Sequence, residues 1–197
     1  GQALTLNAGT VDNTQGQIAA QTDLTLHAAT LANTRGRIVA DQGTLSVATA
    51  GATRNDSGLL QAAQAVTLSN AGLTNGIAAG QPQGGLISGA VVAIDTHGQA
   101  ASNTDGTLQS TGKLTLRTGA LDNDGGLILS GGKLAIDTAA QHLSNRNAAQ
   151  HTGGNGGIFA QGALDIASGD LDNSDGRLGS QQQLTIAAAQ LANTRGA

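Results

Sequence analysis

The sequence predicts an all-β fold, a parallel β-helix (β-solenoid) of about nine coils, and three observations support this prediction. One pattern, Leu/Val-x-Asn-x-x-Gly-x-Ile/Leu, recurs along the chain, as in 11–18 and 121–128. The asparagines of this pattern and of its partial copies follow one another at intervals of 20, 22 or 28 residues. The chain has 30 glycines, one proline and a single aromatic residue. A broad globular core needs more large aromatic side chains than this. A unit this short cannot bury a core alone, so the units must stack.

The first expected strand of each coil is a run in which two apolar residues flank a small or polar one. Examples are Leu4–Leu6, Leu24–Leu26 and Leu114–Leu116. Apolar residues two apart point to the same face of a strand, and the middle residue points to the other face. The middle residue is mostly Thr, Ser or Ala, which suits a solvated outer surface in a strand.

The second expected strand is the Leu-x-Asn run, and the third is a Gly-x-Ile-x-Ala run such as 16–20. Three short strands joined by corners make one coil of roughly 20–28 residues. Successive coils should lie about 4.8 Å apart, so nine coils give a rod of roughly 40 Å. A leucine-rich repeat is disfavoured, because that fold places Asn about three residues after Leu-x-Leu, whereas Asn33 follows Leu26 by seven residues.

The repeated asparagine predicts a ladder of side-chain amides at one corner. Asn can adopt the left-handed backbone conformation that corners require, and its amide has donors and an acceptor. Amides stacked at the coil spacing can therefore bond to one another. We expect the glycine three residues later to supply a positive φ angle at the next bend. The expected ladder comprises Asn13, Asn33, Asn55, Asn75, Asn103, Asn123, Asn145, Asn173 and Asn193.

The chain is expected to be a single β-helix segment over 1–197, a fragment of a longer rod, with corner insertions near 76–85 and 146–157. Ile77 is an alternative candidate for the interior position that follows the first insertion. Both insertions follow the same corner, three coils apart, so they should project from one side. Insertions on one face of a solenoid often bind partners, although corners also tolerate polar insertions at little cost. The candidate partner-binding residues are Gln81, Pro82, Gln83, Arg146, Asn147 and His151.

Composition disfavours several other functions. The net charge is −4 and the arginines are scattered, so nucleic-acid binding is not expected. No run is long enough for a transmembrane segment. The chain has no Cys for disulfides or zinc-thiolate sites, and we expect no cofactor and no metal. The acidic turns 122–125 and 170–176 are similar to calcium loops, but the chain lacks the Glu that an EF-hand requires. Solvated turn aspartates are the better interpretation.

Catalysis is not expected. The four histidines lie in different repeats, and no nucleophile motif is present, although abundant Ser, Thr and Asp leave a chance triad geometry open. The alternative is a β-helical polysaccharide lyase or hydrolase, which is disfavoured by the dispersed arginines and by the lack of aromatic residues for sugar stacking. An ice-binding solenoid would need a flat double array of Thr, whereas the outward row here is single and interrupted.

The alternation of Asn-x-x-Gly-x-Ile and Leu-Thr-Leu at about twenty residues resembles the shaft repeats of filamentous haemagglutinin. The related two-partner secretion exoproteins, which include adhesins and contact-dependent growth-inhibition proteins, are similar. Units 31–38 and 121–128 carry the resemblance most clearly, and it covers 1–197.

The resemblance implies a right-handed rod that is secreted to the cell surface of a Gram-negative bacterium. It implies export through an outer-membrane transporter. The segment would then be a structural shaft that extends and presents adhesive, receptor-binding or toxin regions, with a host or neighbouring-cell receptor as a further partner. Exposed strand edges at both ends predict end-to-end association.

Overall fold

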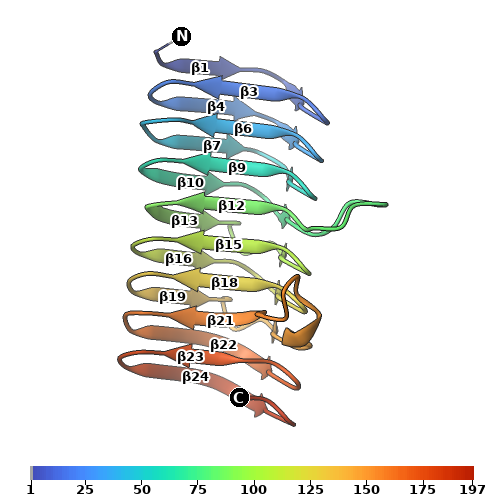
Figure 1. Cartoon of the computed structure of the whole chain (residues 1–197), viewed down its shortest axis with the longest axis vertical. Helices are drawn as coiled ribbons and strands as arrows, with labels where there is room; N and C mark the ends of the chain where they lie inside the picture. The colour runs from blue at the N-terminus through green and yellow to red at the C-terminus, as the bar shows by residue number, and fades with distance from the viewer. Residues whose placement is uncertain (1) are drawn as a thin grey trace.

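The computed structural model describes residues 2–197, which form a stack of flat coils running from one end of the molecule to the other (Figure 1). These residues contain 24 strands and a single 3-10 helix, η1 (Ala148–Gln150). Every pair of neighbouring strands is parallel. The predicted all-β parallel β-helix of about nine coils is therefore confirmed.

The first face of the stack is built from the apolar-x-apolar runs. Equivalent positions lie directly above one another, since Leu4 pairs with Leu24 and Leu24 pairs with Leu45. The strands of this face are β1 (Leu4–Asn7), β4 (Leu24–Ala28), β7 (Leu45–Thr49), β10 (Ala65–Ser69), β13 (Val91–Asp95), β16 (Leu114–Arg117) and β19 (Leu134–Asp137).

The second face holds the Leu-x-Asn runs, which form short strands. In the last two coils one long strand continues from the first face into the second, because residues at the corner keep their backbone pairing, as Ser168 does with Ala188. These long strands are β22 (Leu164–Asp172) and β24 (Leu184–Ala192). The short strands are β2 (Thr10–Asp12), β5 (Thr30–Ala32), β8 (Thr53–Arg54), β11 (Leu73–Thr74), β14 (Ala101–Ser102), β17 (Leu121–Asp122) and β20 (Leu143–Ser144).

The third face holds the runs that follow the recurrent glycine. It is a separate eight-stranded sheet, whereas β22 joins the first two faces into one sheet of 16 strands. The strands of the third face are β3 (Gln17–Ala20), β6 (Arg37–Ala40), β9 (Leu59–Ala62), β12 (Leu86–Gly89), β15 (Thr107–Ser110), β18 (Leu127–Ser130), β21 (Gly157–Ala160) and β23 (Leu178–Ser180).

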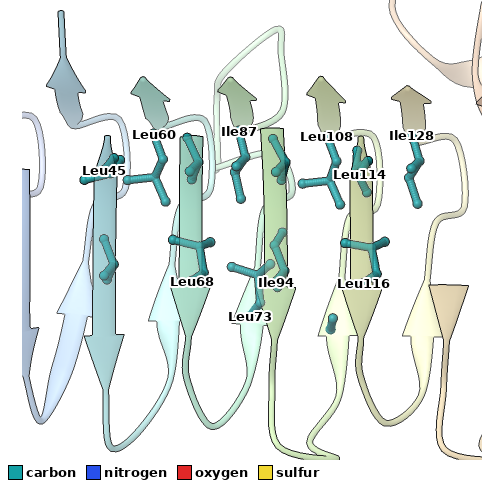
Figure 2. Packing of buried hydrophobic residues seen from close by; sticks show 14 of the residues in the cluster. Leu45, Leu60, Leu68, Leu73, Ile87, Ile94, Leu108, Leu114, Leu116 and Ile128 are labelled. Atoms are coloured by element: carbon teal, nitrogen blue, oxygen red, sulfur yellow. The ribbon is translucent and has the colours of Figure 1, made fainter. Parts of the chain in front are cut away.

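The interior is a narrow column of aliphatic side chains from all three faces. Figure 2 shows Leu68, Ile94 and Leu116 in one row along the first face and Leu45 in the neighbouring row, and Leu60 belongs to the third-face set that meets them. All five are at most 2% exposed. Burying one such side chain stabilises the fold by about 1.5–3 kcal/mol. Because each coil offers few of them, a coil is stable only between neighbours.

Small or polar residues turn the chain at the corners. Between the first and second faces, buried Thr49, Thr118 and Thr138 donate their hydroxyl hydrogens to nearby backbone carbonyl oxygens at 2.6–2.8 Å. Asn70 occupies the same corner, is fully buried, and has no hydrogen-bond partner for either side-chain atom among the described residues. The corner between the second and third faces holds the repeated asparagines.

Candidate functional site

The nine repeated asparagines form one continuous line of hydrogen bonds along the corner between the second and third faces. Each Nδ2 donates to the Oδ1 of the asparagine in the next coil, and the eight distances lie between 2.6 and 2.8 Å. The first eight are at most 6% exposed. The bonded residues are Asn13, Asn33, Asn55, Asn75, Asn103, Asn123, Asn145, Asn173 and Asn193.

The prediction of positive φ angles at the ladder asparagines and at the glycines three residues later is wrong. The left-handed residue lies between them, two positions after the asparagine, as in Arg35 and Asp105, with φ of 57° at both. The glycine is required for space instead. A Cβ on Gly106 would lie 1.9 Å from the backbone oxygen of Asn75 and 2.6 Å from Oδ1 of Asn103. The corner is so tight that any side chain would displace the ladder.

The first insertion projects away from the stack between β11 and β12 (Figure 1). It returns on itself through an antiparallel bridge between Ile77 and Gly84. Ser57 of the preceding coil holds its base, because its Oγ donates to the Gln83 carbonyl at 2.6 Å and accepts from the Ala78 amide at 2.9 Å. Ile77 is 42% exposed and Ile87 is fully buried, so the alternative that places Ile77 in the interior is wrong.

Within this insertion, Pro82 and Gln83 are exposed and Gln81 is half-buried. Their place on the hairpin agrees with a loop that leaves the corner and comes back without entering the core.

The second insertion lies between β20 and β21 and curls against the stack (Figure 1). Asn147 takes a left-handed conformation before η1. His151 is 8% exposed, and its Nδ1 lies 2.9 Å from the Gly125 carbonyl oxygen. The Arg177 guanidinium donates to the Gly154 carbonyl at 2.9 Å. Two neighbouring coils therefore hold this insertion in place.

Arg146 links three successive coils at the start of the second insertion. Its Nε donates to Asp124 Oδ2 at 2.9 Å and to Ser144 Oγ at 3.1 Å, and it lies 3.9 Å from Asp172 Oδ2. Burial raises the pKa of Asp124, but hydrogen bonds from Arg146 and Ser144 outweigh burial and hold this pKa below its ordinary value. The ion pair also raises the pKa of Arg146.

A groove of about 330 Å³ lies between the two insertions. Gln83 lines it from the first insertion and His151 from the second, and β15 provides Thr107 and Gln109. Asp105 also lines this groove. Of the six predicted loop residues, the structure thus brings Gln83 and His151 together, whereas Gln81, Pro82, Arg146 and Asn147 do not line this groove.

A larger trough of about 520 Å³, which was not predicted from the sequence, crosses the second face. Its lining includes the charged residues Arg54 and Arg146 and the small residues Gly72, Ala100 and Ala120. The signal was present in the sequence, because small residues repeatedly precede the Leu-x-Asn run in the central coils.

The turn aspartates have local partners. Oδ1 of Asp12, Asp122 and Asp172 each accepts a hydrogen bond at 2.9 Å from the backbone amide two residues later. This is an Asx turn, a local role that needs no ion. Residues 2–197 contain no group of three or more side chains placed to hold a metal.

One serine, histidine and aspartate lie in the order of a catalytic triad. Ser69 Oγ is 2.9 Å from His97 Nε2, and His97 Nδ1 is 3.6 Å from Asp95 Oδ1. The second distance exceeds that of a hydrogen bond. The His97 side chain is 61% exposed, and neither groove described above includes any of the three residues. Outside both grooves, these three side chains form a contact at the surface.

The repeat pattern of this chain has a counterpart among known protein families. A family model described as haemagglutinin repeat matches four overlapping regions, 1–55, 39–96, 77–147 and 147–197. No curated protein and no solved structure matches the chain. Among the described residues there is also no helix with the length and apolar character that crossing a membrane would require.

Proposed function

Because the chain belongs to the haemagglutinin repeat family, we propose that it is a structural shaft segment of a secreted surface exoprotein. The shaft extends the parent protein and presents adhesive, receptor-binding or toxin regions. The observation that carries this proposal is the unbroken line of eight asparagine bonds through nine coils. A continuous line fixes every coil against the next, and a rod of this kind grows in length with coil number.

The shaft role is tested by changing the number of coils. Residues 104–123 form one complete unit from one ladder asparagine to the next, so extra copies keep every column in phase. We expect five added copies to lengthen the rod by about 24 Å, at about 4.8 Å per coil. Small-angle X-ray scattering measures the maximum dimension. The control adds five copies that each lack two residues. If in-phase copies left the length unchanged, the chain would not be a shaft.

We propose export through an outer-membrane transporter to the surface of a Gram-negative bacterium, as in two-partner secretion. Repeated coils support this, since each coil can pack on the previous one as it emerges. The test co-expresses the parent with its transporter and follows protease sensitivity on intact cells. Digestion only after cell lysis would contradict surface exposure.

The two insertions are the proposed place of contact with a host or neighbouring-cell receptor. They wall one groove, and they leave the ladder beneath them unbroken. Replacing 76–85 by Thr-Asp-Gly, the tight corner of 104–106, should remove the hairpin and keep the coil. We expect unchanged unfolding and lost attachment to target cells. The matched control exchanges 34–36 for the same Thr-Asp-Gly, at a corner that does not line the groove. Full attachment without the hairpin would exclude it from the contact.

The enzyme alternative has little support, since the family is one of structural repeats and the Ser69–His97–Asp95 set is exposed. A turnover assay on pectin-like and glycan substrates tests it. Turnover that persists after repeated purification, and is lost in a folded variant with one changed side chain, would favour a β-helical lyase or hydrolase.

A further inference from the structure

Asparagine followed by glycine is the sequence most open to spontaneous loss of the side-chain amide, because glycine offers no Cβ to hinder attack by its own backbone nitrogen. The chain contains this pair twice, at Asn75-Gly76 and at Asn155-Gly156. The two pairs lie in opposite surroundings. One belongs to the buried ladder and the other to the second insertion.

In the ladder pair, hydrogen bonds restrain both the side-chain amide of Asn75 and the backbone nitrogen of Gly76. Asn75 Nδ2 donates to Asn103 Oδ1 at 2.8 Å and to the Gly85 carbonyl at 3.0 Å. Asn75 Oδ1 accepts from Asn55 at 2.7 Å. The Gly76 amide, which would have to attack, donates to Asp56 Oδ1 at 2.9 Å. Reaction at Asn75 therefore requires the ladder to open.

In the insertion pair only the backbone nitrogen of Gly156 is hydrogen-bonded, and the side chain of Asn155 is not. Asn155 is exposed, and its side chain has no hydrogen bond to any other described residue. It stands in the run Gly-Gly-Asn-Gly-Gly, where Gly153, Gly154 and Gly157 have positive φ angles of 84°, 70° and 129°. The Gly156 amide donates to the Ala148 carbonyl at 3.0 Å. That bond lies within the insertion, so it can open without disturbing a coil.

We propose that Asn155 is a site of deamidation and isomerisation in the folded protein, and that the fold protects Asn75. The Gly156 nitrogen loses its proton to water and bonds to Cγ of Asn155. The bond from Cγ to Nδ2 then breaks, and ammonia leaves with a proton from solvent. Water opens the resulting five-membered imide at either carbonyl, which gives aspartate or isoaspartate.

The product changes the insertion in two ways. One neutral amide becomes a carboxylate, so the formal charge falls from −4 to −5. The new charge lies next to Gly154, whose carbonyl accepts the Arg177 hydrogen bond. Isoaspartate also adds a methylene group to the backbone of the loop that carries His151 and Thr152, two groove-lining residues. The modification would thus alter the wall of the groove between the insertions.

The test ages the folded protein at mildly alkaline pH and digests it with trypsin. The Asn155 pair falls in peptide 147–177 and the Asn75 pair in peptide 55–113, because only Arg146, Arg177, Arg54 and Lys113 bound them. Mass spectrometry detects the gain of about 1 Da that replaces an amide by a carboxylate. An isoaspartyl methyltransferase then labels the isomerised product. We expect modification to accumulate in 147–177 and not in 55–113.

Unfolding in urea is the internal control, and there both pairs should react at similar rates. Asn155→Gln keeps an amide but forms a less favourable ring, so modification of 147–177 should be lost. Asn155→Asp supplies the aspartate product as a chromatographic standard. The proposal is overturned if the folded protein modifies 147–177 no faster than 55–113.

Discussion

The side-chain amide of an inner ladder asparagine donates to one neighbour and accepts from the other, so its removal breaks two hydrogen bonds. Asn123 donates to Asn145 and accepts from Asn103, both at 2.7 Å. Asn123→Ala leaves Asn145 Oδ1 buried and unpaired, at about 1–3 kcal/mol. It also removes the nearest acceptor of Asn103 Nδ2, which keeps only the longer bonds to the Gly106 and Leu127 carbonyls at 3.2 Å. We expect a clearly lower melting temperature. Asn7→Ala, at an exposed position of β1, is the control. Equal melting curves for the two variants would contradict the role of the ladder.

The recurrent glycine is predicted to be intolerant of even one added methyl group. Gly106→Ala places a Cβ against the backbone oxygen of Asn75, and overpacking of this kind typically costs about 1–3 kcal/mol. Gly9→Ala has open space around its Cβ and no positive φ, so it should be neutral. Urea unfolding of both variants measures the difference. A neutral Gly106→Ala would show that the corner can relax.

Acid is predicted to weaken the link that Arg146 makes between coils. The pKa of Asp124 is lowered from its ordinary 3.8. A lowered pKa contributes stability above the unfolded value, and this contribution is lost as pH falls through the folded value. The difference in unfolding free energy between the wild type and Asp124→Asn should therefore be largest at neutral pH and shrink as pH falls below 3.8 through the lowered pKa of Asp124. A difference that did not change with pH would exclude the ionised pair as its source.

At this scale the sequence predicted where the asparagines and glycines recur, because spacing is visible without coordinates. It did not predict why glycine is needed. A positive φ and a close backbone contact both select glycine, and only the position of the Asn75 oxygen beside Gly106 separates them. The Arg146–Asp124 pair joins residues 22 apart, and no pattern in the sequence marks it.

Among the structural elements, the corner between the first and second faces contains one mismatched residue. Asn70 stands where neighbouring coils have Thr49 and Thr96, and neither of its side-chain polar atoms has a partner within residues 2–197. Asn70→Thr restores a hydroxyl that can reach a backbone carbonyl, so the free energy of unfolding should rise by about 1–3 kcal/mol. The reciprocal Thr118→Asn should lower it. A less stable Asn70→Thr variant would mean that the amide has a partner in solution.

The strands were predictable because apolar residues two apart leave a clear pattern. The paths of the two insertions were harder to predict from the sequence. Ile77 has the residue type of an interior position, yet the hairpin bridge to Gly84 turns it outward. The groove walled by Gln83 and His151 depends on how two loops 68 residues apart approach one another, and a single sequence does not encode that distance visibly.

For the whole molecule, the last coil presents an unpaired apolar layer. Leu184 and Leu191 are 43% and 54% exposed, whereas Leu164 and Leu171 one coil earlier are at most 1% exposed. We expect concentration-dependent end-to-end association of this chain, because a second copy can cover that layer and pair with the strand edge. Light scattering over a concentration series measures it. Leu191→Asp should reduce association, and a strict monomer at high concentration would refute it.

The ladder also has a direction. In each of the eight bonds, the asparagine on the N-terminal side donates and the one on the C-terminal side accepts. Amide groups aligned in this way have dipoles that add instead of cancelling, and each bond polarises the next. The rod is therefore electrically polar along its axis, with the oxygen of Asn13 at its negative pole and the amide hydrogens of Asn193 at its positive pole. Opposite poles attract, so electrostatics favours two such rods meeting head to tail over meeting head to head.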